Sequence, residues 1–144
     1  MKTFLINIDN IPDERELVLL LGKDVYSCYS KFTSTIISLL SPDVEKWDIA
    51  GRRGKYFNGY QINDKHILID IYLSAVNGQG LISCELKLPK RYFARILKHK
   101  ECFVSDLQKN IESTNEERNN GFYLGFFLNK VTVESALLII EIIS

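Results

Sequence analysis

The chain has 144 residues, of which 46% are hydrophobic and 25% are charged, values typical of one folded globular domain. Lysine and arginine together number 18, as do aspartate and glutamate, so the formal net charge at neutral pH is zero. A neutral chain has no overall field that attracts nucleic acid or anionic lipid, so any such binding must come from local patches.

The cysteine content and the hydropathy predict a soluble, cytoplasmic protein. Three scattered cysteines, Cys28, Cys84 and Cys102, are too few for a disulfide framework and indicate free thiols. The most apolar run, residues 136–143, is interrupted by Glu141 and is far shorter than the roughly 20 residues that span a membrane. We therefore expect no membrane association.

The first 42 residues predict a short strand or ordered arm followed by two helices. Alternating apolar residues mark the arm at residues 2–8. Pro12 and the acidic residues after it suit the start of a helix, which Gly22 can close. Over residues 24–40 the apolar side chains recur at steps of three and four, which is typical of an amphipathic helix, and Pro42 ends it.

The next segment predicts an antiparallel sheet. Four strands are expected, at residues 47–50, 55–62, 66–74 and 81–88. The separators G-R-R-G, N-D-K and V-N-G-Q-G are turn sequences, because Gly and Asn tolerate the positive φ of tight hairpins. In the last two strands every second residue is apolar, so one face of the sheet should be buried.

The C-terminal part predicts a helix over residues 89–100, a second from a capping-box pattern at Ser105 to about Arg118, a strand at 122–128, and a final helix capped by Thr132 or Asn129. This order predicts one α+β domain over residues 1–144. We expect a mainly antiparallel sheet of about four to six strands, packed on one face against about four helices.

Motifs for chemistry are weak in this chain. His99 and Cys102 form an H-x-x-C pair, but a structural zinc site needs four ligands and no second pair exists. No G-x-S-x-G elbow is present. Asp70 and Glu85 lie on the faces of their strands opposite the apolar residues, where they are either ordinary outward carboxylates or part of a pocket. We expect no metal, no cofactor and no catalytic residue.

The stretch G-R-R-G-K-Y-F-N-G, residues 51–59, combines glycines, basic residues and aromatics, as phosphate-binding loops do. It lies between two predicted strands, however, and a phosphate cradle requires the N-terminus of a helix. We therefore interpret residues 51–54 as a hairpin turn that exposes Arg52 and Arg53. The alternation after it places Tyr56, Asn58 and Tyr60 on one face of the strand and Phe57 on the other.

Basic residues are concentrated in two places. Residues 87–100 contain six lysines and arginines and no acid, and Arg91, Arg95 and Lys98 follow the i, i+4, i+7 spacing of one helix face. Arg52 and Arg53 form the second cluster. The stripe is either a solvated helix face or a patch for an acidic partner, a protein or a nucleic acid. Nearby aromatics that could stack on bases are Tyr56, Phe57, Tyr60 and Tyr92.

The chain also resembles a family of small uncharacterised bacterial proteins, known only as a domain of unknown function. The resemblance rests on L-L-G-K-D-V-Y, on Trp47 before G-R-R-G-K-Y-F, and on the closing G-F-Y-L-G-F-F-L-N-K-V-T-V-E-S-A-L-L-I-I-E-I. It implies a compact α+β domain and no functional site.

These features favour a non-enzymatic cytoplasmic protein that binds another macromolecule, as immunity and inhibitor proteins do. The expected partner is a protein with an acidic surface, contacted through Arg52, Arg53, Arg91, Arg95 and Lys98. The alternatives are a nucleic-acid-binding protein that uses the same basic surface, and a small-ligand binder or enzyme with a pocket at Asp70, Tyr72 and Glu85.

Overall fold

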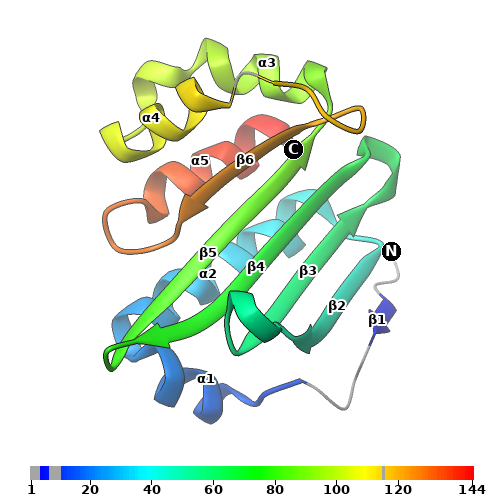
Figure 1. The fold of residues 1–144 in the computed structure, drawn as a ribbon. Coiled ribbons are helices and arrows are strands. Elements are labelled where there is room, and N and C mark those ends of the chain that lie inside the picture. The colour runs from blue at the N-terminus through cyan, green and yellow to red at the C-terminus, as the bar shows by residue number, and fades with distance from the viewer. Residues whose placement is uncertain (1–3, 7–10, 115) are drawn as a thin grey trace.

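The computed structural model describes residues 4–6, 11–114 and 116–144, which form one sheet with helices on one side (Figure 1). The strands are β1 (Phe4–Ile6), β2 (Val44–Ile49), β3 (Tyr56–Ile62), β4 (Ile67–Val76), β5 (Gln79–Leu88) and β6 (Phe122–Phe127). The α-helices are α1 (Glu14–Leu21), α2 (Lys23–Leu40), α3 (Lys90–Lys98), α4 (Ser105–Ser113) and α5 (Val133–Ile143). Three 3₁₀ turns are η2 (Gly51–Arg53), η3 (Asn63–Lys65) and η4 (Lys100–Cys102).

The six described strands lie in the order β1-β2-β3-β4-β5-β6, which is their order along the chain. Strands β2 to β6 pair antiparallel, joined by short turns except between β5 and β6, where α3 and α4 intervene. Strand β1 pairs parallel to β2, because α1 and α2 carry the chain back before β2 begins. The α+β fold with a mainly antiparallel sheet is confirmed. Of the predicted arm, residues 4–6 form β1, and the remainder lies outside the described residues.

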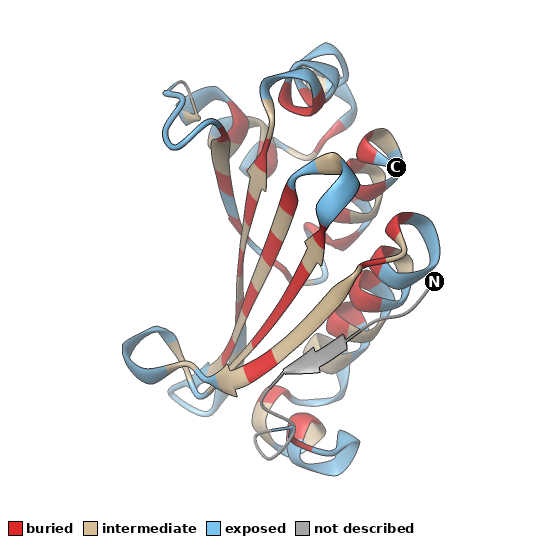
Figure 2. Ribbon diagram, turned by 90° about the vertical axis from the view of Figure 1, so that its right-hand side faces the viewer, coloured by how far each residue is buried: buried red, intermediate tan, exposed pale blue. Residues whose placement is uncertain are grey.

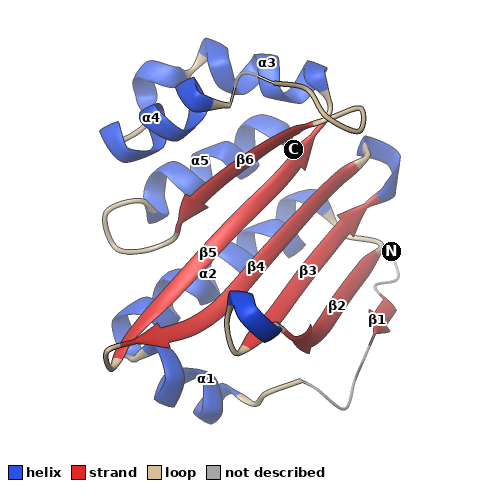
Figure 3. Ribbon diagram, in the orientation of Figure 1, coloured by secondary structure: helices blue, strands red, loops and turns tan. Residues whose placement is uncertain are grey.

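Among the described helices, α2 and α5 cover one face of the sheet, and α4 lies at the β6 edge. In Figures 1 and 3, α2 and α5 run behind the sheet, and they pack against each other. Helix α1 contacts one end of β4 and β5, α3 contacts α5 and β5, and α4 lies beside β6. None of the described α-helices lies across the face that Figure 1 turns toward the reader. We call this surface the open face.

The hydrophobic core lies between the sheet and α2 and α5. The apolar alternation predicted for the third and fourth strands is confirmed, since Ile67 through Leu73 on β4 and Ile82 through Leu88 on β5 are buried at every second residue. Figure 2 shows this alternation of buried and half-buried residues along the strands. Phe32 and Ile36 of α2 are fully buried, and the Phe32 ring packs against that of Phe126 on β6.

A polar network lies inside this covered face, over β2 and β3. The Tyr29 hydroxyl donates to Asn58 Oδ1 at 2.7 Å, and Asn58 Nδ2 donates to Glu45 Oε2 at 3.3 Å. The same carboxylate oxygen accepts from Trp47 Nε1 at 2.8 Å and from the Tyr60 hydroxyl at 3.3 Å. Burial raises the pKa of the Tyr29 and Tyr60 phenols, with Glu45 adding to the shift, so both stay protonated donors.

Two local expectations were wrong. Helix α4 ends at Ser113 instead of continuing to Arg118, because residues 118–121 form a tight hairpin in which Asn119 and Asn120 have positive φ. The capping box at Ser105 does not form either. Val104 precedes the helix without a side-chain cap, and Gln108 Nε2 donates to the Phe103 carbonyl at 2.8 Å.

Candidate functional site at the η2 end and open face of the sheet

The two predicted basic clusters lie at opposite ends of the sheet. Arg52 and Arg53 are exposed in η2. Lys55, two residues after that turn, donates its backbone N–H to the Leu73 carbonyl near the end of β4. Lys65, just before the start of β4, has its ammonium 5.2 Å from the Tyr92 ring of α3. The six strand positions from 67 to 73 separate the two ends by about 20 Å. The structure does not bring the two clusters into one patch.

On α3, the predicted basic residues are exposed and partly engaged with one ring. The guanidinium groups of Arg91 and Arg95 lie 4.7 and 5.1 Å from the centre of the Tyr92 ring. Burial acts to raise the pKa of Tyr92, but Arg91 and Lys65 outweigh it and lower the pKa. Lys98 is exposed at the end of the helix. Tyr92 is itself buried, so it holds these cations in place and is not free to stack on a base.

At the other end, Arg53 lies on the open face. Its guanidinium is 3.9 Å from the centre of the Tyr72 ring, and Nη1 donates to the Tyr72 hydroxyl at 3.1 Å. The Tyr72 ring in turn lies 5.2 Å from that of Phe57, its cross-strand neighbour. Cation–ring and ring–ring contacts of this kind orient side chains that would otherwise be mobile at a surface. Arg53 is therefore a positioned cation at one end of the open face.

The middle of the open face carries two adjacent carboxylates. The strand register aligns Lys46, Gly59, Asp70, Glu85 and Gly125 in one row across the sheet. Asp70 and Glu85 are direct cross-strand neighbours, half-buried, and no described Lys or Arg lies within ion-pair distance of either. Burial raises the pKa of Asp70, Glu85 raises it further, and Arg53 and Lys46 lower it in part.

Both neighbours of this carboxylate pair in the row are glycines, but they differ. A Cβ on Gly59 would lie 2.7 Å from the Phe57 ring, so that ring already covers the glycine. Gly125 is exposed, and a Cβ there would meet only the Cys84 carbonyl oxygen at 3.7 Å. The surface beside Glu85 is therefore open over Gly125.

Helix α4 turns this opening into a groove. One hollow of about 230 Å³ is lined by Arg53, Ser83, Glu85 and Phe127, together with Asn110 of α4 and Gly125. A second, of about 260 Å³, is lined by the same Asn110 and Gly125 and continues to Ser113, Arg118 and Tyr123. We call the two adjoining hollows the α4–β6 groove.

The far end of this groove also holds a tyrosine between cations. The Tyr123 ring lies 5.1 Å from the Arg118 guanidinium and 5.9 Å from the Lys87 ammonium. Arg118 and Gly121 exchange two backbone hydrogen bonds across the Asn119–Asn120 turn, at 2.8 and 3.0 Å, which holds the backbone of Arg118. Glu116 lines the same end, so its charge is mixed.

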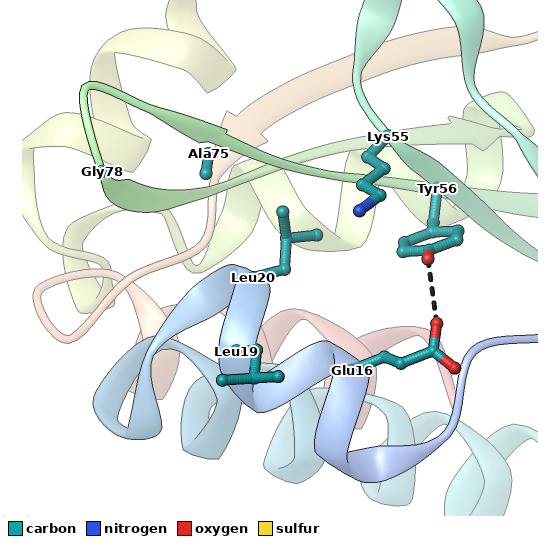
Figure 4. A pocket seen from close by; sticks show the side chains of 7 residues that line it. All are labelled: Glu16, Leu19, Leu20, Lys55, Tyr56, Ala75 and Gly78. Carbon is teal, nitrogen blue, oxygen red and sulfur yellow. Dashed lines mark hydrogen bonds between the residues drawn. The ribbon is translucent and has the colours of Figure 1, made fainter.

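A third hollow, of about 350 Å³, lies where the start of β3 and the β4–β5 turn face α1 (Figure 4). The Tyr56 hydroxyl donates to Glu16 across it at 3.1 Å, and Leu19, Leu20 and Ala75 supply apolar walls. Large apolar side chains are exposed at this end of the sheet: Leu19, which lines the hollow, is 78% exposed, Ile49 66% and Val76 52%. Together with Arg52 and Arg53 these three residues make up what we call the tip surface.

Residues for other chemistry are scattered. Within the described ranges, no group of three His, Cys, Asp or Glu is placed to hold a metal ion. Neither histidine lines the α4–β6 groove, and Cys84 is buried on the covered face, where burial raises its pKa far above the ordinary value. In the part of the chain that the structure describes, no helix is long and apolar enough to cross a membrane.

Sequence reasoning identified Arg53, Asp70, Tyr72 and Glu85 but missed most of the groove lining, including Asn110, Arg118, Tyr123, Gly125 and Phe127. These residues come together only because α4 returns beside β6, which local patterns do not reveal. One signal was present in the sequence, since Gly125 lies in the middle of the strand predicted at residues 122–128. A glycine at such a position often marks close approach by a ligand or another backbone.

Comparison with known proteins identified no relative: no family model, no curated protein and no solved structure matches this chain. The resemblance to the uncharacterised bacterial family stays a prediction.

Proposed function

We propose that this protein acts by binding another protein, in the manner of an immunity or inhibitor protein, and that the tip surface is the contact. The observation that carries this proposal is the exposure of Leu19, Ile49 and Val76 at the end of the sheet where the arginines of η2 lie. Exposed apolar groups rimmed by charge are typical of protein-binding surfaces. The arginines suit an acidic patch on the partner, since guanidinium groups bind carboxylates in a bidentate way.

Binding is favoured over catalysis because the groove lacks an activated nucleophile. Glu85 of its lining and the adjacent Asp70 are half-buried, no histidine lines the groove, and the thiol of the lining residue Cys84 is buried on the covered face. The free cysteines support a reducing compartment such as the bacterial cytoplasm, which we propose as the site of action.

The test uses charge reversal at each basic cluster in turn. The partner is first identified by co-purification from the native host and mass spectrometry, and then produced separately. We expect Arg52→Glu with Arg53→Glu to weaken binding at least about tenfold and to reduce its salt dependence. The matched control is Arg91→Glu with Arg95→Glu and Lys98→Glu, which reverses three charges at the other end of the sheet. Loss of binding only in the α3 variant would move the contact to α3, and unchanged binding in both would refute the basic contact.

A second measurement separates the apolar contribution. Leu19 is largely exposed, so Leu19→Ser leaves the core intact. It should weaken binding without changing the slope of affinity against salt, because it removes buried apolar area and no charge.

Nucleic-acid binding is the second candidate, supported by aromatic rings of the open face that lie against cations, such as Phe57 with Lys46 and Tyr123 with Arg118. The carboxylates of Asp70 and Glu85 between them disfavour a polyanion. This alternative predicts retardation of short single-stranded oligonucleotides at low salt, weakened by Tyr123→Ala. Absence of retardation at about 50 mM salt would remove it.

A further inference from the structure

We propose that the α4–β6 groove binds an extended segment of about five residues from the partner protein, with a lysine or arginine side chain at Glu85 and an acidic side chain two positions away at Arg53. This inference rests on the proposed function and specifies what part of the partner is recognised.

The shape of the groove suits an extended chain. Its lining follows β6 from Phe127 through Gly125 to Tyr123, four strand positions or about 13 Å, which an extended peptide covers with about five residues. An extended peptide directs every second side chain to one side, the same period as residues 127, 125 and 123 of the strand. The ligand side chains that point into the groove can therefore align with residues 127, 125 and 123 of β6.

Gly125 forms the floor of the groove, and neither its backbone conformation nor its packing requires a glycine there. Gly125 does not have the positive φ that would require glycine, and a Cβ there would make an ordinary contact with the Cys84 carbonyl. A side chain at this position would instead fill the hollow between Glu85 and Asn110. The position thus offers a way to block the groove while leaving the fold intact.

Charge along the groove sets the order of the ligand side chains. Glu85 is the cross-strand partner of Gly125, so its carboxylate lies beside the midpoint, with Asp70 one strand further away at about 5 Å. This half-buried pair lacks a neutralising ion pair among the described residues, and a ligand ammonium or guanidinium would supply one.

Arg53 defines the neighbouring position. Tyr72, on which it lies, is in the same row across the sheet as Ser83 and Phe127, two residues along β6 from Gly125. Its guanidinium has five N–H groups, and one of these bonds to Tyr72, so others can receive a ligand carboxylate. Opposite charges two residues apart in the groove predict opposite charges two residues apart in the ligand. Asn110 and Ser83 add polar groups for the ligand backbone.

The test compares capped five-residue peptides of equal composition. In one, glutamate and lysine stand two positions apart; in the other they are adjacent, so that an extended chain points them to opposite sides. We expect amide chemical shifts of ¹⁵N-labelled protein to change around Ser83, Glu85, Gly125 and Phe127, with the first peptide binding about tenfold more tightly than the second. Equal binding of the two peptides, or shifts located elsewhere, would overturn the proposal.

Two variants address the groove itself. Gly125→Leu should abolish the shifts caused by the first peptide, while Ser38→Leu, which adds the same side chain at an exposed position of α2, should leave them unchanged. Thermal unfolding of Gly125→Leu shows whether the variant is folded. Gly125→Ala, with its smaller side chain, shows whether the loss of peptide binding requires a side chain large enough to block the groove. If Gly125→Leu folds and still binds the peptide, the groove is not its site. If an oligothymidylate produces these shifts and the peptides do not, the occupant is nucleic acid and the proposal is wrong.

Failure of this inference is distinguishable from failure of the proposed function. Capture of the purified partner by wild type and Gly125→Leu alike, together with loss in the Arg52→Glu and Arg53→Glu variant, would retain the tip surface and reject the groove. Peptide binding without any protein partner would reject the tip surface and retain the groove.

Discussion

Asp70 and Glu85 lie directly opposite each other on β4 and β5, half-buried and without an ion pair to a described lysine or arginine. Like charges in this position destabilise a sheet, and the fold accepts that cost in the middle of its open face. We expect this pair to lower the free energy of unfolding of the isolated protein. That effect can be measured without knowing the partner.

Replacement of Asp70 by asparagine should stabilise the isolated protein at neutral pH. The pKa of Asp70 is raised in the folded state, so folding disfavours its charged form, and the penalty grows as pH rises from the unfolded pKa through the folded one. We expect Asp70→Asn to raise the free energy of unfolding by about 0.2–1 kcal/mol at pH 7. Below about pH 3 we expect no gain, because Asp70 is then protonated in both the folded and the unfolded state. Urea unfolding at the two pH values measures this. Equal effects at both would show that the charge is not the cause.

The buried hydrogen-bond network around Asn58 should contribute to the stability of the fold. Tyr29→Phe removes the donor to Asn58 Oδ1 and leaves that oxygen unsatisfied inside the protein. We expect a loss of about 1–3 kcal/mol in the free energy of unfolding, with an unchanged m-value. Tyr26→Phe is the matched control, because the hydroxyl of this half-buried tyrosine has no hydrogen-bond partner among the described residues. Similar losses in both variants would mean that the hydrogen bond to Asn58 is not stabilising.

Two glycines of neighbouring strands should respond oppositely to alanine. A Cβ on Gly80 would fall 2.5 Å from the Cα of Leu21 and collide with the carbonyl of the same residue, so β5 would have to move away from α1. We expect Gly80→Ala to cost about 1–3 kcal/mol and Gly125→Ala to be neutral or slightly stabilising. Thermal unfolding of both decides it, and a loss in Gly125→Ala would contradict the open floor of the groove.

Thiol labelling checks the placement of three distant segments at once. Cys102 is exposed, whereas Cys28 and Cys84 are buried and burial raises the pKa of both thiols. Maleimide at neutral pH should therefore modify one cysteine per folded molecule, identified as Cys102 by peptide mass mapping, and three after unfolding in guanidinium. Rapid native labelling of Cys84 would contradict the covered face of the sheet.

Much of the fold followed from local pattern. Alternation placed Ile69 and Cys84 on the buried face and Asp70 and Glu85 on the other, because a strand has a period of two and each β-hairpin has a short turn. The length of α4 was mispredicted because its polar surface continues into the Asn119–Asn120 turn without a break in composition.

The candidate site was only half accessible to the same reasoning. Arg53 was identified by its exposed turn, but its contact with Tyr72 depends on how η2 folds over the neighbouring strands. Asn110 and Gly125 meet through tertiary packing of residues that are neither hydrophobic nor charged, and these carry no periodic signal. The arginine stripe of α3 was correctly placed on an exposed helix face, while its distance from η2 depends on the topology of the sheet.

The long connection between β5 and β6 bears on the stage of folding at which the groove forms. Residues 89–121 separate β5 from β6, whereas β2 to β5 follow one another through short turns. Closing a longer loop costs more conformational entropy, so the four-strand meander can assemble before the last strand docks. Asn110 and Gly125 both follow the meander along the chain, so we expect a partly folded chain in which only the meander has formed to lack the groove.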